Sequence, residues 1–453
     1  MLNNAQPLRP VLGRRSHRSR VETLPHKRIS SPPSRWESVF VICVLLMAMG
    51  AFLNLGTSGL AEPSDASSGT LPLQIAWGIV SLLSIYLLLQ CRQWLRILWG
   101  ERRILTVSLL VAASVLWSDA TAISMRRAVV FAATISFALY YALRFSLRDQ
   151  LRLLAWSLGI AALASVPFAI FGIGTPTEFF RDAWNGVFLH KNALGHYMAL
   201  SFLVFVIAGR EEAIRKPLCF GGSALSLCLV LLSRSATSLV LLVFTIMLLT
   251  IARTPLVRHP YKLAACLLLI FTFAWSVFFG LEEYSGVLEA LGKDSSLTGR
   301  TEVWAASWEA AMSRPMLGYG YSAFWLGENG PSRYVWKELH WEVPHAHNGY
   351  IDLALQLGLL GLVTFGIVVV LQFRDSLYLM RTHASPAATW PFAFLWFFLL
   401  SNITESDLLR PHTLSLILYV SAMIMAWRVR HNRRNDDPLV HRPFIHTAEP
   451  AGA

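Results

Sequence analysis

The sequence predicts an all-α polytopic membrane protein, and three observations support this prediction. Hydrophobic residues make up 55% of the 453-residue chain and charged residues only 15%, well below the roughly 25% that is usual in soluble proteins. Apolar runs of membrane-spanning length recur along the chain. Lys and Arg gather in alternate connections between these runs. This pattern excludes a disordered chain and argues against a soluble enzyme.

A helix needs about 20 apolar residues to cross the hydrocarbon core, and a window of that size finds about twelve candidate spans. The third and the eleventh are short, so each is either a span or a broken or re-entrant segment. In chain order the candidates are Val39–Leu55, Leu73–Gln90, Ile104–Trp117, Ala128–Leu143, Leu153–Ile173, Leu194–Ala208, Leu218–Leu232, Thr237–Ile251, Leu263–Leu281, Gly349–Leu371, Trp390–Ile403 and Leu414–Trp427.

Charge sets the expected orientation, because Lys and Arg resist translocation across the membrane. With both termini in the cytoplasm, most of the 39 Lys and Arg residues fall on the cytoplasmic side. The excess persists from loop to loop, so we expect an even number of spans. The net charge of +12 in so hydrophobic a chain favours a membrane protein over a nucleic-acid binder.

These spans divide the chain into five parts. The parts are a disordered basic cytoplasmic tail at 1–36, the first nine transmembrane helices at 37–281, a long outer loop between helices 9 and 10 at 282–346, the last three helices at 347–428 and a second cytoplasmic tail at 429–453. We expect neither tail to form a packed core, because both are polar and charged.

The long outer loop is expected to contain an amphipathic helix over Thr301–Ser313, ended by Pro315. Trp304 and Trp308 lie one helical turn apart, which places this helix on the membrane surface, over a cavity, or against the helix bundle. Loops of this length are usually lids or binding elements.

Cations on the outer side are the first candidates for a binding site. Arg234 is the most informative of them, because it lies in a very tight turn between two apolar spans. A cation at membrane depth is costly and is a functional candidate by default. The alternatives are a snorkelling anchor and an ion pair with Asp352 or Glu405. The other cations expected on this side include Arg126, Arg127, Lys191, Arg300 and Arg410.

Several cations at one membrane surface suit a polyanion at headgroup level, such as a lipid-linked pyrophosphate. Arginine holds phosphate oxygens through a planar fork without a metal ion. The sequence has no HExxH motif, no Walker A loop and no CxxC pair, so we expect neither a metal nor another cofactor. Arg126 and Arg127 are alternatively interfacial anchors.

Two histidines, His345 and His347, lie where the long loop re-enters the membrane. A neutral imidazole, with a reference pKa of about 6.5, suits a general base. Asn348 is a suitable N-cap for the apolar helix that follows, which leaves His347 at the membrane edge. By composition alone, His347 is equally a structural or metal-binding histidine.

The pair His347-Asn348, separated by nine residues from Gly358-Leu359-Leu360-Gly361, is similar to the histidine motif of the O-antigen ligase/polymerase (Wzy-C) superfamily. Other segments resemble the same superfamily in order, and they are Leu116-Trp117-Ser118, His190-Lys191-Asn192, Ser233-Arg234-Ser235, Leu297-Thr298-Gly299-Arg300-Thr301, Leu317-Gly318-Tyr319-Gly320 and Asn402-Ile403-Thr404-Glu405-Ser406. The segment around Arg300 is most similar to the exopolysaccharide polymerase branch.

The resemblance implies a GT-C-like membrane glycosyltransferase in the bacterial inner membrane, with its active site on the periplasmic side. The implied substrate is an oligosaccharide linked to undecaprenyl pyrophosphate, and the implied acceptor is a growing polysaccharide or lipid A-core. A separate chain-length regulator is typical of such pathways, and no nucleic acid is involved. The implied reaction is polymerisation of exopolysaccharide or O-antigen repeat units.

The same resemblance implies roles for individual residues, with His347 as the base and Arg234 and Arg300 on the pyrophosphate. Glu405 is expected to orient a catalytic group or to pair with a cation. The complete expected site consists of catalytic His347 and Glu405, pyrophosphate-binding Arg234, Arg300, Lys191 and Arg127, and the further candidates His345 and Asn348.

Three other functions stay open. A ligase would use the same chemistry to move a finished glycan to lipid A-core or to a protein. A twelve-helix transporter or flippase usually carries its long connection between two equal halves, whereas here the long connection follows the ninth span. An inactive scaffold would require Arg234, Arg300 and His347 all to be anchors or ion-paired residues.

Overall fold

The computed structural model describes residues 32–53, 71–91, 93–173, 183–251, 298–340 and 342–431, with isolated residues between 254 and 272. Every regular element within these ranges is a helix, in agreement with the all-α prediction. Nearly all of the two expected tails, most of the expected ninth span and the first part of the long loop, residues 282–297, lie outside the described residues.

The helices are named here in chain order. The α-helices are α1 (Arg35–Ala48), α2 (Leu71–Gln90), α3 (Trp94–Gly100), α4 (Arg102–Ala113), α5 (Thr121–Arg144), α6 (Leu147–Phe171), α7 (Lys191–Arg210), α8 (Lys216–Leu232), α9 (Ala236–Ile251), α12 (Thr298–Ser313), α13 (Arg333–Leu339), α14 (Gly349–Thr382), α15 (Trp390–Ser401) and α16 (Leu414–His431). Short 3₁₀ helices are η2 (Ser114–Leu116), η5 (Gly327–Asn329) and η6 (Pro386–Thr389).

Polar capping residues fix the ends of several apolar helices. The Ser146 hydroxyl accepts a hydrogen bond from Asp149 N at 3.1 Å and so caps the start of α6. Gly172 ends the same helix in the left-handed conformation, with a φ of 63°. Such caps satisfy backbone groups that the helix itself leaves unpaired.

Five helices in the described part of the chain are long and apolar enough to cross a membrane. They are α2, α5, α6, α7 and α14, and α8, α9 and the η6–α15 unit are shorter apolar helices. In α2 only 17% of the apolar window is buried, so most of its surface is left for lipid. The chain is therefore a multi-pass membrane protein, although the full set of about twelve spans is not reproduced by the described residues.

Two expected spans appear as shorter elements. The third, Ile104–Trp117, is the twelve-residue α4 followed by η2, and the eleventh, Trp390–Ile403, is the twelve-residue α15. Conversely, the expected span Gly349–Leu371 extends to Thr382 in α14. These differences concern helix length, and they leave the order of the elements as expected.

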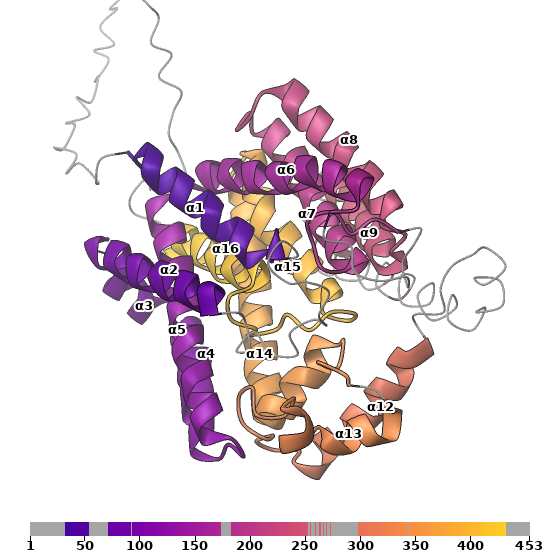
Figure 1. Ribbon diagram of the computed structural model, residues 1–453. Helices are drawn as coiled ribbons and strands as arrows, with labels where there is room; N and C mark the ends of the chain where they lie inside the picture. Colours follow the sequence, from indigo (N-terminus) through magenta and orange to yellow (C-terminus); the bar gives the residue numbers. More distant parts are fainter. Residues whose placement is uncertain are drawn as a thin grey trace, which may run out of the picture.

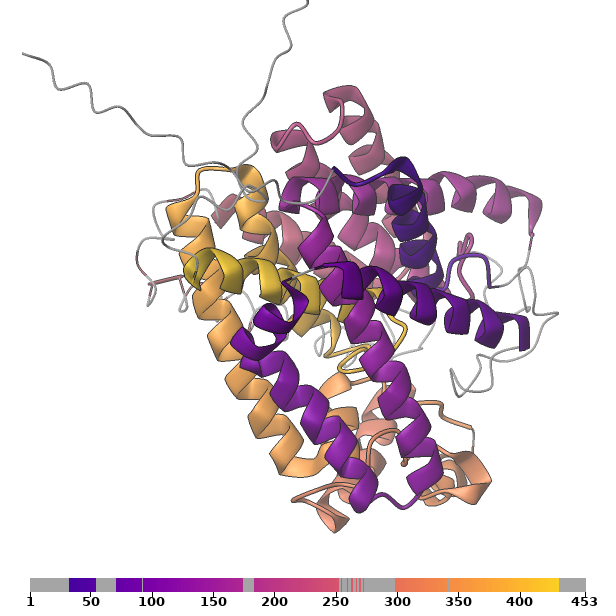
Figure 2. The same ribbon diagram turned by 90° about the vertical axis from the view of Figure 1, so that its left-hand side faces the viewer.

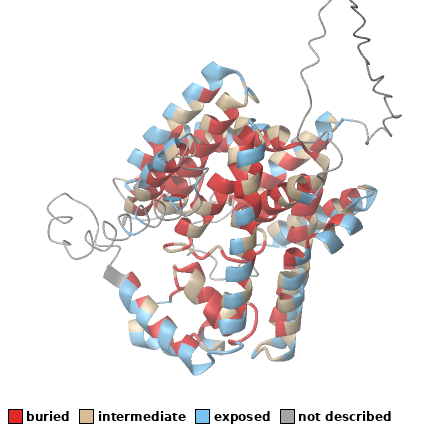
Figure 3. Cartoon of the chain, turned by 180° about the vertical axis from the view of Figure 1, so that it is seen from behind, coloured by how far each residue is buried: buried red, intermediate tan, exposed pale blue. Residues whose placement is uncertain are grey.

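Helices α4, α5 and α14 run side by side, and α12 and α13 lie together at one end of the molecule, next to the tip of the α4–α5 hairpin (Figures 1 and 2). Helix α12 packs on α14, and α16 packs on α5, α14 and α15. Buried residues gather at the centre of this bundle, and the outlying helices present exposed faces (Figure 3).

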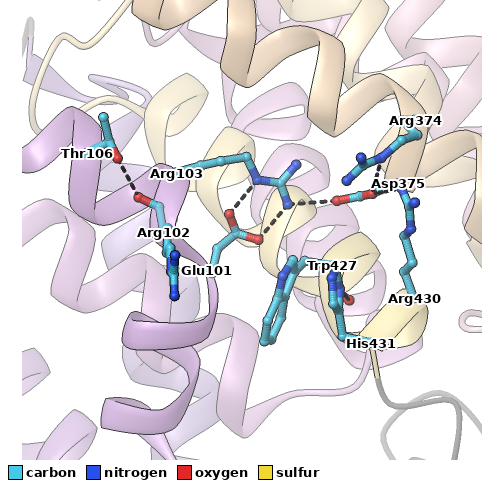
Figure 4. A network of polar contacts seen from close by, with 9 residues as sticks. All are labelled: Glu101, Arg102, Arg103, Thr106, Arg374, Asp375, Trp427, Arg430 and His431. Atoms are coloured by element: carbon cyan, nitrogen blue, oxygen red, sulfur yellow. Dashed lines mark hydrogen bonds and ion pairs between the residues drawn. The ribbon is translucent and has the colours of Figure 1, made fainter.

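A charged network joins α4, α14 and α16 near the end of α14 that is distant from the histidines (Figure 4). Arg103 binds Glu101 in a bidentate manner and lies 2.9 Å from Asp375. Asp375 is fully buried and also pairs with Arg430 at 2.6 Å and Arg374 at 3.2 Å. Each buried charge therefore has an opposite charge beside it, as a stable interior requires.

Near its first turns α14 is broken, and a distant segment pairs with the break. Gly358 has a φ of 61° and a ψ of −157° inside the helix. Leu359 N donates to Pro315 O at 2.7 Å, and Tyr319 N donates to Leu355 O at 2.8 Å. A side chain at Gly358 would lie 2.4 Å from the backbone of Met316. Glycine is therefore required here both for the conformation and for the close approach.

Candidate active site

The loop at residues 344–348, here called the histidine loop, is held by two side chains from other elements. The carbonyl of Ala346 accepts from Trp304 Nε1 of α12 at 2.9 Å. The N–H of Ala346 donates to Asp352 Oδ1 of α14 at 3.2 Å. The same oxygen accepts from Trp325 Nε1 at 2.7 Å. Both peptide groups of this residue are therefore committed, which fixes the direction of the histidines on either side of it.

The start of α14 closes the loop, and the segment after α15 wraps around it. Asn348 Oδ1 accepts from two N–H groups in the first turn of α14, at 3.0 and 3.2 Å, as predicted for an N-cap. Gly349 N lies 2.8 Å from Asn402 O and 2.9 Å from Glu405 O. Asn348 N donates to Ser406 Oγ at 3.1 Å. The segment at residues 402–406, noted for its resemblance, therefore belongs to the same site.

His345 and His347 form a tight pair of imidazoles, with ring centroids 4.1 Å apart and an angle of 63° between the planes. His347 N donates to His345 Nδ1 at 3.2 Å, so a neutral His345 carries its proton on Nε2. His347 has a φ of 50°, a conformation that costs about 1–2 kcal/mol for a residue with a side chain. Its Nδ1 is buried and has no hydrogen-bond partner among the described residues.

A third histidine lies in the same surroundings. His190 is the N-cap of α7, and its Nδ1 accepts from Asn192 N at 3.1 Å. A neutral His190 therefore also carries its proton on Nε2. His190 and His345 are thus suited to donate a hydrogen bond, whereas His347 keeps an uncommitted ring nitrogen.

The electrostatic surroundings favour neutral imidazoles in this site. Burial, followed by repulsion from Arg300, His190 and Arg410, lowers the pKa of His347 to about 3. Burial also places the pKa of His345 well below its ordinary value, with contributions from His347 and the same three residues. Arg300, Arg410 and His190 therefore all lie within electrostatic range of the pair formed by His345 and His347.

The two arginines of this site have no acidic partner within ion-pair distance among the described residues. Arg300 is 8% exposed, and its Nη1 is buried without a hydrogen-bond partner in that part of the chain. Arg410 is exposed and lies within electrostatic range of Asp352 and His347. A buried guanidinium left unpaired is costly, so the arrangement can accept an anion such as a phosphate group.

Arg234 and Lys191 come from the α7–α9 part of the chain. Arg234 lies exposed in the α8–α9 turn with a φ of 49°. This turn packs on α7, because a side chain placed at Gly195 would lie 2.7 Å from Ser233 Oγ. Lys191 is the buried first residue of α7, directly after His190. Their contact with a substrate stays a prediction.

Arg127 lies within electrostatic range of His412 and Tyr321. It lies on α5 and is 7% exposed. Burial, followed by Arg127, lowers the pKa of His412 to about 4. The His412 ring stacks on Trp77 with centroids 4.0 Å apart. The expected role of Arg127 on the pyrophosphate stays a prediction.

Glu405 contributes to the site through its backbone, because its carbonyl accepts from Gly349 N at 2.9 Å. Its carboxylate lies within electrostatic range of Tyr197, and so do the carboxylate of Asp407 and the guanidinium of Arg410. The expected catalytic role of this carboxylate stays a prediction.

Sequence reasoning did not select two members of the site, Arg410 and His190. Arg410 had the same signal as the selected arginines, a cation in an outer connection. His190 lies in a segment that resembles the family, next to the selected Lys191. The missing information was spatial, because neither residue is close in sequence to the histidine loop.

Comparison with known proteins indicates the same superfamily as the sequence motifs. A family model described as O-antigen ligase matches residues 221–366, a range that includes Arg234, Arg300, His345 and His347. The exopolysaccharide production protein ExoQ of Rhizobium meliloti (strain 1021) is 28% identical over 337 residues, which cover 70% of this chain and 75% of ExoQ. The predicted resemblance to the Wzy-C superfamily is confirmed. Together the two matches support a ligase or polymerase of O-antigen or exopolysaccharide.

Proposed function

We propose that the protein polymerises exopolysaccharide or O-antigen repeat units by glycosyl transfer from an undecaprenyl-pyrophosphate-linked glycan. The acceptor is a sugar hydroxyl of another lipid-linked or growing chain. The observation that carries this proposal is that Arg300 and Arg410 act electrostatically on His347, whose buried Nδ1, like Arg300 Nη1, has no hydrogen-bond partner among the described residues. This combination provides an anion site beside a base.

In the proposed step, His347 removes the proton from the acceptor hydroxyl as its oxygen attacks the anomeric carbon. The bond between that carbon and the pyrophosphate oxygen breaks, and undecaprenyl pyrophosphate leaves with the electron pair. Arg300 and Arg410 stabilise the charge that grows on the leaving group, with Arg234 and Lys191 as further cations. A single displacement of this kind inverts the configuration at the anomeric carbon.

The other two imidazoles support this step as donors. His190 and His345 hold their protons on Nε2, and His345 can donate to a phosphate or sugar oxygen without changing its charge. The low pKa of His347 keeps it neutral before the substrate binds. A bound pyrophosphate brings negative charge beside the ring and raises its basicity when the reaction needs it.

The proposal includes an orientation and a location. The protein lies in the bacterial inner membrane with both termini in the cytoplasm and the histidine loop on the periplasmic side. The excess of Lys and Arg in the inner connections supports this orientation. The polymerase would act with a chain-length regulator and without a metal ion.

An assay in vitro tests the proposal directly. The purified protein is incubated with a synthetic undecaprenyl-pyrophosphate-linked repeat unit, with and without a metal chelator. Polymerisation predicts a ladder of products and free undecaprenyl pyrophosphate in both reactions. A repeat unit that is recovered unchanged on its carrier would contradict the proposal. Polymerisation that is lost only when the chelator is present would contradict the metal-free mechanism.

A ligase is the second candidate, because the matching family model is described as O-antigen ligase. The two functions share the chemistry and differ in the acceptor. Cells lacking the protein distinguish them by product size. Short chains indicate a lost polymerase, whereas full-length chains that are not attached to lipid A-core or protein indicate a lost ligase.

A further inference from the structure

Helix α12 has two different long faces, one turned toward the histidine loop and one turned outward. On the inward face, Arg300 is buried and Trp304 donates to the histidine loop. On the outward face, Trp308 and Met312 lie one turn apart and are 49% and 48% exposed. The sequence placed both tryptophans on one stripe, but the structure directs them to different surroundings.

The exposed apolar surface continues beyond the end of α12. We define the apolar patch as five exposed side chains outside the five helices long enough to cross a membrane, which are Leu116, Trp308, Met312, Met316 and Leu317. The two chain segments are in contact, because Trp117 Nε1 donates to Leu317 O at 2.9 Å. Exposed apolar patches of this kind mark a surface that is covered by lipid or protein.

The patch joins the lipid-facing surfaces of two membrane spans. On α14, Leu359 and Leu360 are exposed, and their N–H groups donate to Pro315 O and Met316 O. On α5, Met125 and Val129 are exposed one turn apart, close to the tip that carries Leu116. An apolar side chain exposed on a membrane span faces lipid, so the bilayer surface extends from both spans onto the patch.

The border of the patch along the flank of α12 is polar. Glu302 and Glu309 are exposed on the flank of α12 beside Trp308 and Met312. A helix with an apolar stripe bordered by charge lies in the plane of a membrane surface. Tryptophan is enriched at this depth, because its ring is apolar and its N–H is polar.

We propose that α12 is an interfacial helix that rests on the lipid leaflet on the histidine side, with Trp308, Met312 and the following Met316 and Leu317 inserted at headgroup level. Arg300 lies about 12 Å along the helix axis from Trp308. The helix therefore holds the guanidinium and the histidine loop at a fixed depth relative to the lipid. This inference depends only on α5 and α14 crossing the membrane and is independent of the proposed reaction.

Nitroxide accessibility in proteoliposomes tests the depth of α12. In a full-length background without the native cysteines, single labels are placed through Trp308→Cys and Met312→Cys, with Glu302→Cys and Glu309→Cys as matched controls on the polar flank. We expect the ratio of oxygen to nickel-complex accessibility to be several-fold higher at 308 and 312 than at 302 and 309. Two label positions on each flank keep the test valid if one variant fails to fold.

Two outcomes would overturn the proposal. Equal or reversed ratios would place the stripe in water, and labels at 308 and 312 that neither reagent reaches would show that protein covers the patch. Neither outcome depends on glycan transfer. The interfacial position of α12 can therefore be refuted without refuting the proposed polymerase, and the polymerase can be refuted without refuting the position of α12. As a functional arm, Met312→Glu is expected to lower transfer several-fold, whereas Glu309→Gln leaves it unchanged.

Discussion

The two ends of α14 both place an aspartate near arginines, but they treat the positive charge differently. At one end, fully buried Asp375 pairs with Arg103 and Arg430. At the other end, Asp352 binds backbone and tryptophan N–H groups, while Arg300 keeps no ion pair within the described residues. A neutralised cluster stabilises the fold, whereas an unneutralised one is available to a ligand.

The largest expected effect comes from the base. His347→Ala should lower glycan transfer by about 10²–10⁴-fold, because the acceptor hydroxyl then loses its proton without a positioned base. The measurement is product formation by purified protein in proteoliposomes. Normal membrane insertion and thermal stability serve as the control, and near-normal transfer by this variant would refute the role of His347.

The second expected effect separates the two arginine clusters. Arg300→Gln should lower transfer about 100-fold and leave the thermal midpoint unchanged or slightly raised, since no ion pair is lost. Arg300→Lys should recover only part of the activity, because a point charge does not reproduce the planar fork. Initial rates and thermal unfolding of the same preparations provide both readouts.

Arg103→Gln is the matched variant at the other end of α14. It leaves Glu101 and Asp375 short of a partner, and breaking a buried pair in this way costs about 3–5 kcal/mol. Transfer per folded molecule should stay within about two-fold of the parent protein, since the network is far from the reacting groups. A reversal of the two phenotypes would invalidate the comparison.

The break between the two ends of α14 gives an intermediate effect. Gly358→Ala should destabilise the protein by about 1–3 kcal/mol, because the backbone conformation is close to glycine-only and the new methyl group would meet Met316. Gly366→Ala, on the same helix and with no atom near the new side chain, is the control. Equal thermal midpoints for the two variants would contradict the requirement for glycine at the break.

The smallest expected effect is on pH dependence. His347 is deprotonated above a pKa of about 3, so it should not lower kcat/KM between pH 8 and pH 5. Arg410→Gln removes a repelling positive charge, so the pKa of His347 rises and the acidic limb of kcat/KM moves to higher pH, by about half a unit. If the acidic limb of the pH profile stays in place in this variant, or moves to lower pH, Arg410 does not belong to the electrostatic surroundings of His347.

Local features of the site could be predicted from the sequence. The N-cap by Asn348, the α-helix ended before Pro315 and the candidate cations depend on residue types and short spacings. Only the grouping of residues from distant segments required the structure. Arg410 reaches the histidines from a loop in which Leu409 and His412 both have positive φ values, a conformation that these residue types do not signal.

The extent of α14 was also beyond local reasoning. The expected span ends at Leu371, just before the charged Arg374 and Asp375, but the ion pairs from α4 and α16 allow the helix to continue. The break at Gly358 is similar, because the carbonyls and N–H groups that it exposes are satisfied by a segment about 40 residues earlier in the chain.

The pairing of residues 315–320 with the broken helix also constrains how the protein is made. During synthesis this segment emerges before α14, so its backbone groups must stay hydrated until the first turns of α14 have been made. The N–H of Leu359 and the carbonyl of Leu355 would otherwise face hydrocarbon alone. Biogenesis of the site is therefore a late assembly event that follows insertion of the helix it completes.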